Sequence, residues 1–290
     1  MFLFAYFVFR YNPFCVILHY TFYFVLMNQF RSSFWSSIPI VVKNLLLINL
    51  VLWLADLMLP QILYNFIADF DLSDYLGLHY WASDRFNGFQ LISYMFMHAS
   101  FEHLFFNMFA VFMFGSTLER QWGATRFLFY YMVAGIGAGI VQEIMWTIDY
   151  QSLLNAINEA VSLNSGAALL PYETQLRKML SFSDLRYFEA PQLLHMKELI
   201  LNAPVTVGAS GSVFGLLLAF GWLFPQAELM LLFLPIPIKA RLFVALYAVA
   251  ELFLGVANFS GGNVAHFAHL GGMIFGYFLI LYWKKKGKLY

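Results

Sequence analysis

Charged side chains are scarce in this 290-residue chain. Only 11% of its residues are Asp, Glu, Lys or Arg, whereas 61% are hydrophobic. A soluble domain needs charged side chains at roughly a quarter of its positions, so the composition excludes a soluble protein and indicates an integral membrane protein. The 16 basic and 16 acidic residues balance, which by itself says nothing about nucleic-acid or acidic partners. No nucleic-acid partner is expected.

Cysteine is almost absent as well. Because Cys15 is the single cysteine, an intrachain disulfide is excluded, and the redox compartment cannot be inferred from cysteine usage.

The first 26 residues are unusual in another way, because eleven of them are Phe or Tyr. Arg10 and Pro13 interrupt this apolar run, which makes it a poor spanning helix, and no small-residue cleavage site indicates a signal peptide. Our hypothesis is that translation begins at Met27, so that residues 27–290 form the membrane domain. The alternative is that residues 1–26 add one span or a re-entrant segment.

Six apolar stretches have the length of a spanning helix, about 20 residues. The sequence therefore predicts an all-α membrane protein with six spans, at residues 38–59, 101–118, 127–146, 207–224, 242–258 and 265–283.

Two connecting segments are too polar to cross a membrane. Residues 60–97 combine four aspartates with many aromatic side chains, which is typical of a loop in the membrane interface. Residues 147–204 carry ten charged residues and are expected to form an insert of amphipathic helices. These helices are predicted near residues 151–163, 172–181 and 192–201.

The basic residues near the ends of the spans fall on one side of a six-span topology. By the positive-inside rule, both termini then face the cytosol, and the interfacial loop and the insert face outward. The residues concerned are Arg31, Lys43, Arg120, Arg126, Lys239, Arg241, Lys284, Lys285, Lys286 and Lys288.

Ser210 lies in the stretch Gly208-Ala209-Ser210-Gly211 at the start of the fourth predicted span. Small residues there are either a device for close helix packing or the surroundings of a nucleophile. The choice between them depends on polar residues elsewhere in the spans, which are functional candidates by default.

His103 and Asn107 open the second predicted span, where Ser100 is the expected N-cap. They are four residues apart and therefore share one helix face. One interpretation is that they hydrogen-bond this helix to a neighbour. The other is that they donate hydrogen bonds to negative charge that develops during a reaction.

His266 and His269 lie in the sixth predicted span. No carboxylate, cysteine or third histidine follows at ligand spacing, so neither a metal site nor a cofactor is expected. His269 shares its helix face with Gly272 and Gly276, which allows a close approach to another helix. We therefore expect His269, and not His266, to be the functional histidine. His266 is expected to form hydrogen bonds at the outward-facing entrance to the site.

Gly211 and Gly215 offer the matching smooth surface beside Ser210. Contact between the two faces would bring the His269 imidazole to the Ser210 hydroxyl. A histidine can take the proton of a serine hydroxyl and return it to the leaving amine. Because no acidic residue lies within a few positions of either residue, we predict a dyad without a third carboxylate.

The remaining site residues follow from this pair. Phe214, one turn after Ser210, is the expected stacking partner of the imidazole. The Ser210 N–H near the helix N-terminus, together with Asn107 and His103, would form an oxyanion hole. The residues expected to shape the site are Gly208, Gly211, Phe214, Gly215, Gly272 and Gly276.

Three motifs together make a specific pattern across the second, fourth and sixth predicted spans. The motifs are His103-x-x-x-Asn107, Gly208-x-Ser210-Gly211 and Ala268-His269-x-x-Gly272-x-x-x-Gly276. With these motifs the chain resembles the rhomboid family of intramembrane serine proteases, over about residues 38–285.

This resemblance implies a six-helix bundle around a water-filled cavity that opens outward. It implies Ser210 as nucleophile and His269 as base, with Asn107 and His103 at the oxyanion. The stretch 60–97 would match the membrane-embedded loop of the family.

The resemblance also implies that Glu119-Arg120 is a structural pair at the cytosolic end of the second helix. Three features depart from the family pattern. Phe214 stands where tyrosine is common, Phe89-Gln90 stands where the loop often carries Trp-Arg, and the insert at 147–204 is longer than the minimal plan. A weaker loop anchor is therefore expected.

The predicted function is hydrolysis of a peptide bond in or near a transmembrane segment of another membrane protein, without metal or nucleotide. Single-span proteins and the lipid bilayer are the expected partners, and a bacterial inner membrane is the expected location. The alternative is a non-catalytic rhomboid-like protein that binds membrane clients. A small-molecule transporter would need an inverted repeat, which the sequence lacks. Substrate, oligomeric state and the role of the insert stay open.

Overall fold

The computed structural model describes residues 35–67, 70–182, 184–231, 234–257, 265–287 and 289. Helices predominate among them, as the sequence predicted. The hypothesis about residues 1–26 concerns a segment outside the described residues.

Four described helices are long and apolar enough to cross a membrane. These are α3 (Ile40–Leu63), the continuous run of α6, η2 and α7 (Phe101–Trp122), α8 (Ala124–Ser162) and α12 (Ala240–Ala257). The apolar helix α11 (Ser210–Leu223) has 14 residues and is shorter than these four, and α13 (Ala265–Lys285) carries His266 and His269 near its start. The arrangement with six spans therefore stays a prediction.

The second of these runs is not a uniform α-helix. Its three parts are α6 (Phe101–Ala110), the π-helical turn η2 (Val111–Gly115) and α7 (Ser116–Trp122). Single π-turns of this kind often occur near functional sites.

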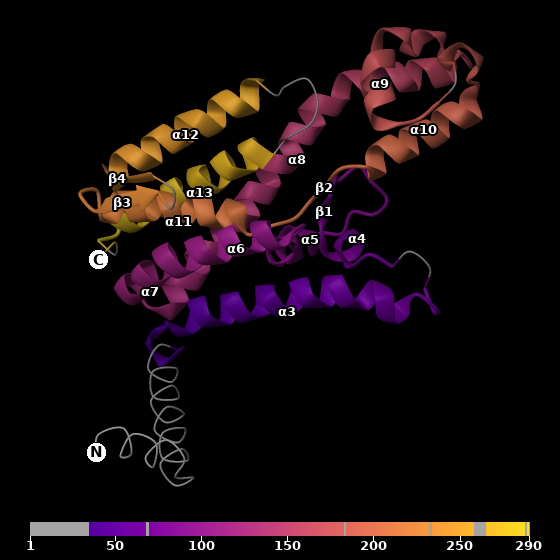
Figure 1. Cartoon of the computed structure of the whole chain (residues 1–290). Coiled ribbons are helices and arrows are strands. Elements are labelled where there is room, and N and C mark those ends of the chain that lie inside the picture. The colour runs from indigo at the N-terminus through magenta and orange to yellow at the C-terminus, as the bar shows by residue number, and fades with distance from the viewer. Residues whose placement is uncertain are drawn as a thin grey trace, which may run out of the picture.

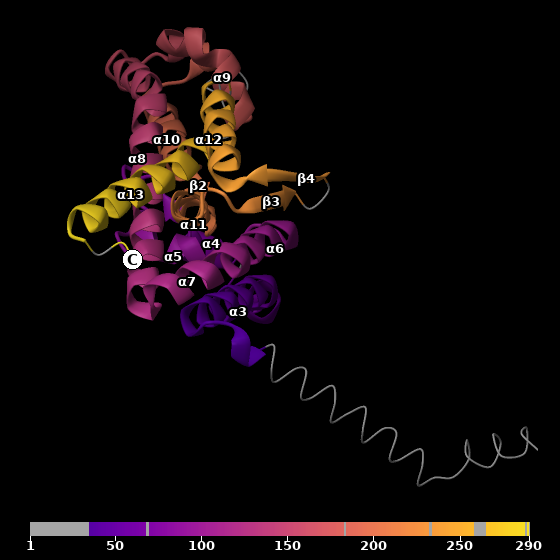
Figure 2. The same ribbon diagram turned by 90° about the vertical axis from the view of Figure 1, so that its left-hand side faces the viewer.

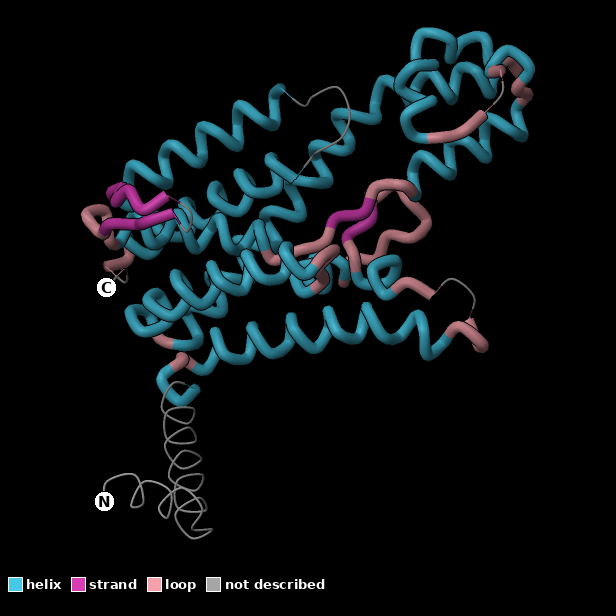
Figure 3. The backbone as a smooth tube through the Cα atoms, in the orientation of Figure 1, coloured by secondary structure: helices cyan, strands magenta, loops and turns pink. Residues whose placement is uncertain are grey.

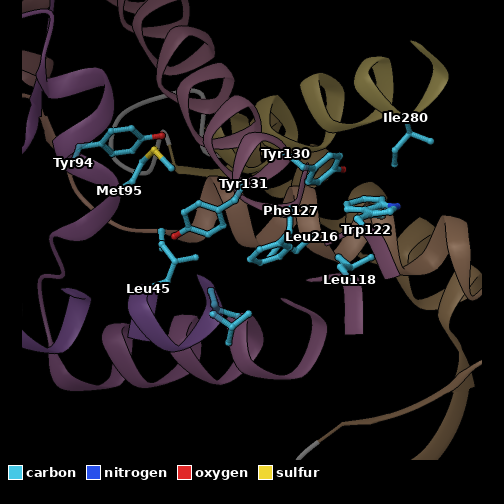
Figure 4. Packing of buried hydrophobic residues seen from close by; sticks show 14 of the residues in the cluster. Leu45, Tyr94, Met95, Leu118, Trp122, Phe127, Tyr130, Tyr131, Leu216 and Ile280 are labelled. Carbon is cyan, nitrogen blue, oxygen red and sulfur yellow. The ribbon is translucent and has the colours of Figure 1, made fainter. Parts of the chain in front are cut away.

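The helices surround a core built mainly from α8, α11 and α13. Figures 1 and 2 show α12 on one side of these helices, with α6 and α7, followed by α3, on the other. Large side chains of α8 fill the space between them (Figure 4), where Phe127, Tyr130 and Tyr131 are fully buried against Leu216 of α11. Buried aromatic area of this kind contributes much of the packing energy.

Glu119 and Arg120 hold the start of α3 against the end of the second run. The two carboxylate oxygens of Glu119 accept hydrogen bonds from the backbone N–H groups of Val41 and Val42, at 2.9 and 2.8 Å. The Arg120 guanidinium donates to the carbonyl of Ser37 at 2.8 Å. Glu119 thus satisfies free N–H groups in the first turn of α3, which has no side-chain cap of its own, and Arg120 binds the carbonyl of a residue just before the helix.

The first helix ends later than predicted, because α3 continues through Pro60 to Leu63. The rest of the segment 60–97 contains short elements around the buried side chain of Gln90. Its oxygen accepts from the N–H groups of His79 and Asn87, and its Nε2 donates to the carbonyls of Tyr75 and Arg85. Gln90 thus supplies a loop anchor of its own where the Trp-Arg pair is lacking. The elements are α4 (Leu72–Leu76), β1 (Leu78–His79), α5 (Gln90–Ser93) and η1 (Tyr94–Phe96).

Two short antiparallel sheets were not predicted from the sequence. Strand β1 pairs with β2 (Val205–Thr206), which ties the loop to the residues just before α11. Between α11 and α12, β3 (Glu228–Leu231) pairs antiparallel with β4 (Leu234–Lys239). The first sheet fixes the path of the chain into the candidate site.

The insert differs from its prediction at the start. The helix expected at 151–163 is the end of α8, which runs unbroken over 39 residues. No Gly or Pro lies between Gly139 and Gly166 to end it sooner. Three further helices and a turn follow, and Figures 1 and 3 show them beyond one end of α8. They are η3 (Gly166–Tyr172), α9 (Glu173–Met179), η4 (Leu185–Tyr187) and α10 (Ala190–Asn202).

The insert has an apolar core separate from that of the bundle. Its side chains interleave between the end of α8 and the following helices, so this part of the chain packs largely upon itself. The core consists of Leu153, Ile157, Ala160, Leu169, Leu176, Leu185, Leu193, Met196 and Ile200.

Candidate active site

Ser210 and His269 meet where α11 and α13 cross. Ser210 is the first residue of α11, and its Oγ lies 2.9 Å from Nε2 of His269 near the start of α13. This distance is that of a hydrogen bond between a hydroxyl and an imidazole. The two residues that the sequence singled out are therefore in direct contact.

Glycines on both helices permit this contact. A methyl group on Gly272 would overlap the carbonyl of Gly211, and one on Gly215 would lie 3.2 Å from the carbonyl of Gly272. Gly276 faces the Tyr130 ring, whose hydroxyl donates to the Gly215 carbonyl at 2.8 Å. The helices therefore pack backbone to backbone, as small residues in a membrane allow.

The His269 ring is held on one face by aromatic stacking. Phe214 lies parallel to it, with ring centroids 4.2 Å apart and an interplanar angle of 7°. Tyr247 of α12 stacks on the other side of Phe214 at 5.1 Å. A column of three rings thus fixes the plane of the imidazole, with the phenylalanine where the family often has tyrosine.

Glu251 overturns the prediction that no carboxylate joins the pair. Its Oε2 lies 3.0 Å from Nδ1 of His269 and 2.7 Å from Nδ1 of His266. Glu251 is buried in α12, in the middle of an apolar run. Glu251 is 18 residues from His269 along the chain, so local spacing does not connect the two, although an ionisable residue within a span is itself a signal of function.

The carboxylate determines which ring nitrogens carry hydrogen. An ionised carboxylate only accepts hydrogen bonds, so both Nδ1 atoms that contact Glu251 must carry the hydrogen. In neutral His269 this leaves Nε2 with a lone pair directed at Ser210. The imidazole is thereby held in the tautomer that accepts a proton from the serine hydroxyl.

Gly208 positions a third polar side chain beside the serine. Its φ of +127° is a conformation that residues with a Cβ rarely adopt. A Cβ there would stand 2.7 Å from the His103 ring and 3.8 Å from Ser210 Oγ. The edge of the His103 imidazole and the serine hydroxyl therefore flank Gly208, whose N–H donates to the Tyr94 carbonyl at 2.8 Å.

Asn107 is buried one turn further along α6. Its Nδ2 donates to the His103 carbonyl at 3.0 Å, which uses one of its two N–H hydrogens. Ser100 caps this helix by accepting from the His103 N–H at 3.1 Å, as predicted. This contact lies within α6 and does not join Asn107 to Ser210, and Asn107 retains one hydrogen for another acceptor.

His98 is a neighbour of the site to which the sequence gave no role. Its ring is only 1% exposed and makes an edge contact with His103, with centroids 5.1 Å apart. Burial, together with the nearby His103 ring, lowers the pKa of His98 to about 3. His98 is therefore neutral near pH 7 and supports His103 by packing.

The residues of this site lie in segments that match a known protein family. A family model described as "Rhomboid domain" matches residues 85–151 and 188–286, which is more than half of the chain. The chain belongs to the rhomboid family. The matched segments contain His103, Asn107, Ser210, Glu251 and His269, and the unmatched residues 152–187 contain most of the insert's core.

Two similar rhomboid proteins are mitochondrial by name. An uncharacterized one from Schizosaccharomyces pombe is 26% identical over 280 residues, which cover 89% of this chain and 68% of the relative. Rhomboid protein 1 of Saccharomyces cerevisiae is 26% identical over 186 residues, 64% of this chain and 39% of the relative.

A putative rhomboid protease of Bacillus subtilis is 39% identical over 61 residues, 21% of this chain and 31% of the relative. This rhomboid chain therefore spans less than two fifths of the second and third relatives. The longer alignments are with mitochondrial rhomboids, so the expected bacterial inner membrane finds no support in them. The multi-pass membrane assignment agrees with the family and with the apolar helices.

Proposed function

We propose that this rhomboid protein is an intramembrane serine endopeptidase with Ser210 as nucleophile and His269 as general base. The observation that carries the proposal is the 2.9 Å contact between Ser210 Oγ and His269 Nε2, with Glu251 behind the imidazole. A serine, a base and a group that orients the base are the parts that nucleophilic acyl transfer needs.

The reaction would proceed in two acyl-transfer steps. His269 Nε2 takes the hydroxyl proton while Oγ bonds to the scissile carbonyl carbon, and the imidazolium then protonates the leaving amine as the C–N bond breaks. Water attacks the acyl-enzyme in the same way, with its proton passing to His269 and then to Ser210. Glu251 would keep the imidazole in its tautomer and stabilise the transient positive charge.

The developing oxyanion would be held by three donors. The Ser210 N–H belongs to the first turn of α11, whose N–H groups have no intrahelical partner and whose dipole favours negative charge. His103 borders Gly208 next to the serine, and Asn107 has an N–H hydrogen to spare. Preorganised donors of this kind commonly contribute most to the rate.

The depth of the serine supports a substrate within the membrane. A helix of 14 residues is about 21 Å long, against about 30 Å for the hydrocarbon core. With the end of α11 at one surface, Ser210 would lie inside the hydrocarbon region. We therefore propose single-span or other membrane proteins as substrates, with the site open to the side opposite the basic clusters.

The mitochondrial names of the relatives with long alignments favour a mitochondrial membrane as the location. Expression of the tagged chain in a eukaryotic cell, followed by fractionation, tests this part of the proposal independently. Recovery of the protein from another membrane would contradict it.

The decisive experiment is labelling of the purified chain with a fluorophosphonate, which reacts with an activated serine and needs no knowledge of the substrate. We expect the wild type to be labelled and Ser210→Ala to be unlabelled. Ser212→Ala is the matched control, because Ser212 is a buried serine of the same helix that donates to the Tyr131 carbonyl. Cleavage of a single-span test protein by the wild type should follow the same pattern.

Equal labelling of the wild type and Ser210→Ala would contradict the assigned nucleophile. A folded wild type that is never labelled would contradict the enzymatic function and favour a rhomboid-like protein that binds membrane clients.

A further inference from the structure

Three metal-ligating side chains converge behind the candidate dyad. Glu251 Oε2, His266 Nδ1 and His269 Nδ1 all lie within 4.8 Å of one another. The carboxylate comes from α12, 15 residues before His266 and 18 before His269. No carboxylate stands at ligand spacing from these histidines along the sequence, but the fold supplies one from another helix.

We propose that Glu251, His266 and His269 form a binding site for Zn²⁺ whose occupation switches the peptidase off. Two imidazole nitrogens and a glutamate oxygen are a known zinc donor set, which leaves a fourth position for water. Imidazole donors favour zinc over Mg²⁺ and Ca²⁺, which prefer oxygen ligands only.

The two imidazoles must approach each other to accept the ion. Their Nδ1 atoms lie 2.7 and 3.0 Å from Glu251 Oε2 and within 4.8 Å of each other, whereas zinc ligands about 2.0–2.1 Å from the metal stand roughly 3.3 Å apart in a tetrahedron. Zinc binding therefore requires slightly longer nitrogen–oxygen separations and a shorter separation between the two Nδ1 atoms. The histidine side chains are 19% and 17% exposed and that of Glu251 is 7% exposed. An ion can thus enter from the histidine side, and the carboxylate provides a buried negative charge.

Metal binding and base catalysis exclude each other at His269. An imidazole that binds zinc through Nδ1 carries its hydrogen on Nε2. The hydrogen moves from Nδ1 to Nε2, so the neutral ring releases no proton. Nε2 then donates to Ser210 Oγ and no longer accepts its proton. The hydrogen of His266 moves from Nδ1 to Nε2 in the same way. At the same time, Glu251 exchanges its hydrogen bonds to both histidines for a bond to the metal.

This inhibitory effect rests on the proposed function, whereas the binding of zinc does not. The binding test therefore uses Ser210→Ala, which keeps all three ligands and lacks the nucleophile. Titration of this variant in detergent with zinc chloride, followed by calorimetry, should show one ion per chain. His266→Ala and Glu251→Ala, each combined with Ser210→Ala, should lower the affinity by at least about 10–100-fold.

A matched control separates this site from surface histidines. His195 lies on α10 with Glu198 3.8 Å away, and both side chains are more than half exposed. His195→Ala in the Ser210→Ala background should leave the zinc affinity unchanged. Loss of affinity in this control but not in His266→Ala would overturn the proposal, as would a Ser210→Ala protein that binds no zinc.

The effect on the nucleophile is measured by the rate of fluorophosphonate labelling. Zinc should slow the wild type by at least about tenfold, and a chelator should restore the rate. His266→Gln keeps a donor for Glu251 but lacks the imidazole, so its rates with and without zinc should be similar. A wild type that binds zinc and reacts at its full rate would overturn the switch.

Zinc binding by calorimetry and fluorophosphonate labelling test the metal site and the peptidase function separately. Labelling of Ser210 combined with no zinc binding would refute the metal site alone. Zinc binding in calorimetry without any labelling of the metal-free wild type would refute the peptidase and with it the switch.

Discussion

The carbonyl oxygen of Gly211 on α11 lies so close to Gly272 on α13 that a methyl group at position 272 would overlap it. This crossing brings Ser210 and His269 within hydrogen-bond distance, at 2.9 Å. The packing and the chemistry of the site therefore depend on the same glycines.

Gly272→Ala should push α13 away from α11. Overpacking of this kind costs about 1–3 kcal/mol, and a displacement of about 1 Å at a reacting group can lower the rate roughly 100-fold. We expect a loss of fluorophosphonate labelling of that order, with a smaller loss of stability in detergent.

Gly88→Ala is the control, because nothing lies within 4 Å of a Cβ at Gly88. It should label like the wild type. Normal labelling of Gly272→Ala would show that the helices can separate without breaking the pair.

The sequence predicted this crossing because the spacing of glycines along a single helix can be read directly. Phe214 stands four residues after Ser210, and Gly272 stands three residues after His269, so the members of each pair share one helix face. Glu251 was missed because its contact to His269 joins two helices across 18 residues. Which way a lone carboxylate on an apolar helix points depends on how that helix is rotated, and local spacing does not determine this.

The course of the insert could be predicted only in part, for a similar reason. The change to polar composition after Trp146 suggested that the third span ends there, but no Gly or Pro breaks the helix before Gly166. Its last turns leave the bundle and build the separate core around Leu153 and Ile157. A change to polar composition indicates that the surroundings of a helix change, whereas helix-breaking residues indicate where the helix ends.

Glu251→Gln should slow catalysis with little effect on substrate binding. The amide carries no negative charge, and its NH2 group can donate to an Nδ1 atom, so His269 loses both its fixed tautomer and the stabilisation of its imidazolium. We expect kcat to fall by about 100-fold or more, with KM nearly unchanged, in cleavage of a single-span test substrate.

Glu159→Gln, at an exposed position near the end of α8, is the control for this change and should be neutral. A rise in KM with unchanged kcat would contradict the positioning role of Glu251.

Phe214 should be replaceable by another flat ring but not by an aliphatic side chain. Phe214→Tyr preserves the parallel stack on His269 and adds the hydroxyl common in the family, so activity should stay within about threefold of wild type. Phe214→Leu removes the ring 4.2 Å from the imidazole and should lower kcat by about tenfold.

Phe220→Leu alters an aromatic cluster on the same helix, with Phe114 and Phe224, away from His269. Equal losses of kcat in Phe214→Leu and Phe220→Leu would indicate general packing in place of ring orientation.

Asn107→Ala should remove one oxyanion donor. Loss of such a donor commonly lowers kcat by about 100–1,000-fold, and we expect a decrease in this range in substrate cleavage. Asn49 provides a close control on α3, since its Nδ2 donates to the Leu45 carbonyl in the same pattern that links Asn107 to His103. If Asn49→Ala lowers kcat as much as Asn107→Ala, the role of Asn107 is structural.

Glu119→Ala should destabilise the fold without altering the chemistry of the site. It leaves the N–H groups of Val41 and Val42 without their acceptors, next to the fully buried Val42 side chain. Each buried donor without a partner costs about 1–3 kcal/mol, and the carboxylate also interacts with the dipole of α3. We therefore expect unfolding in detergent to require about 2–4 kcal/mol less free energy.

Glu119→Gln retains one acceptor oxygen, and its free energy of unfolding should lie between those of Glu119→Ala and the wild type. Because Glu119 lies at the opposite end of its helical run from His103, labelling of Ser210 in the folded fraction should be unchanged. A stable Glu119→Ala protein with impaired labelling would instead connect this end of the bundle to the reaction.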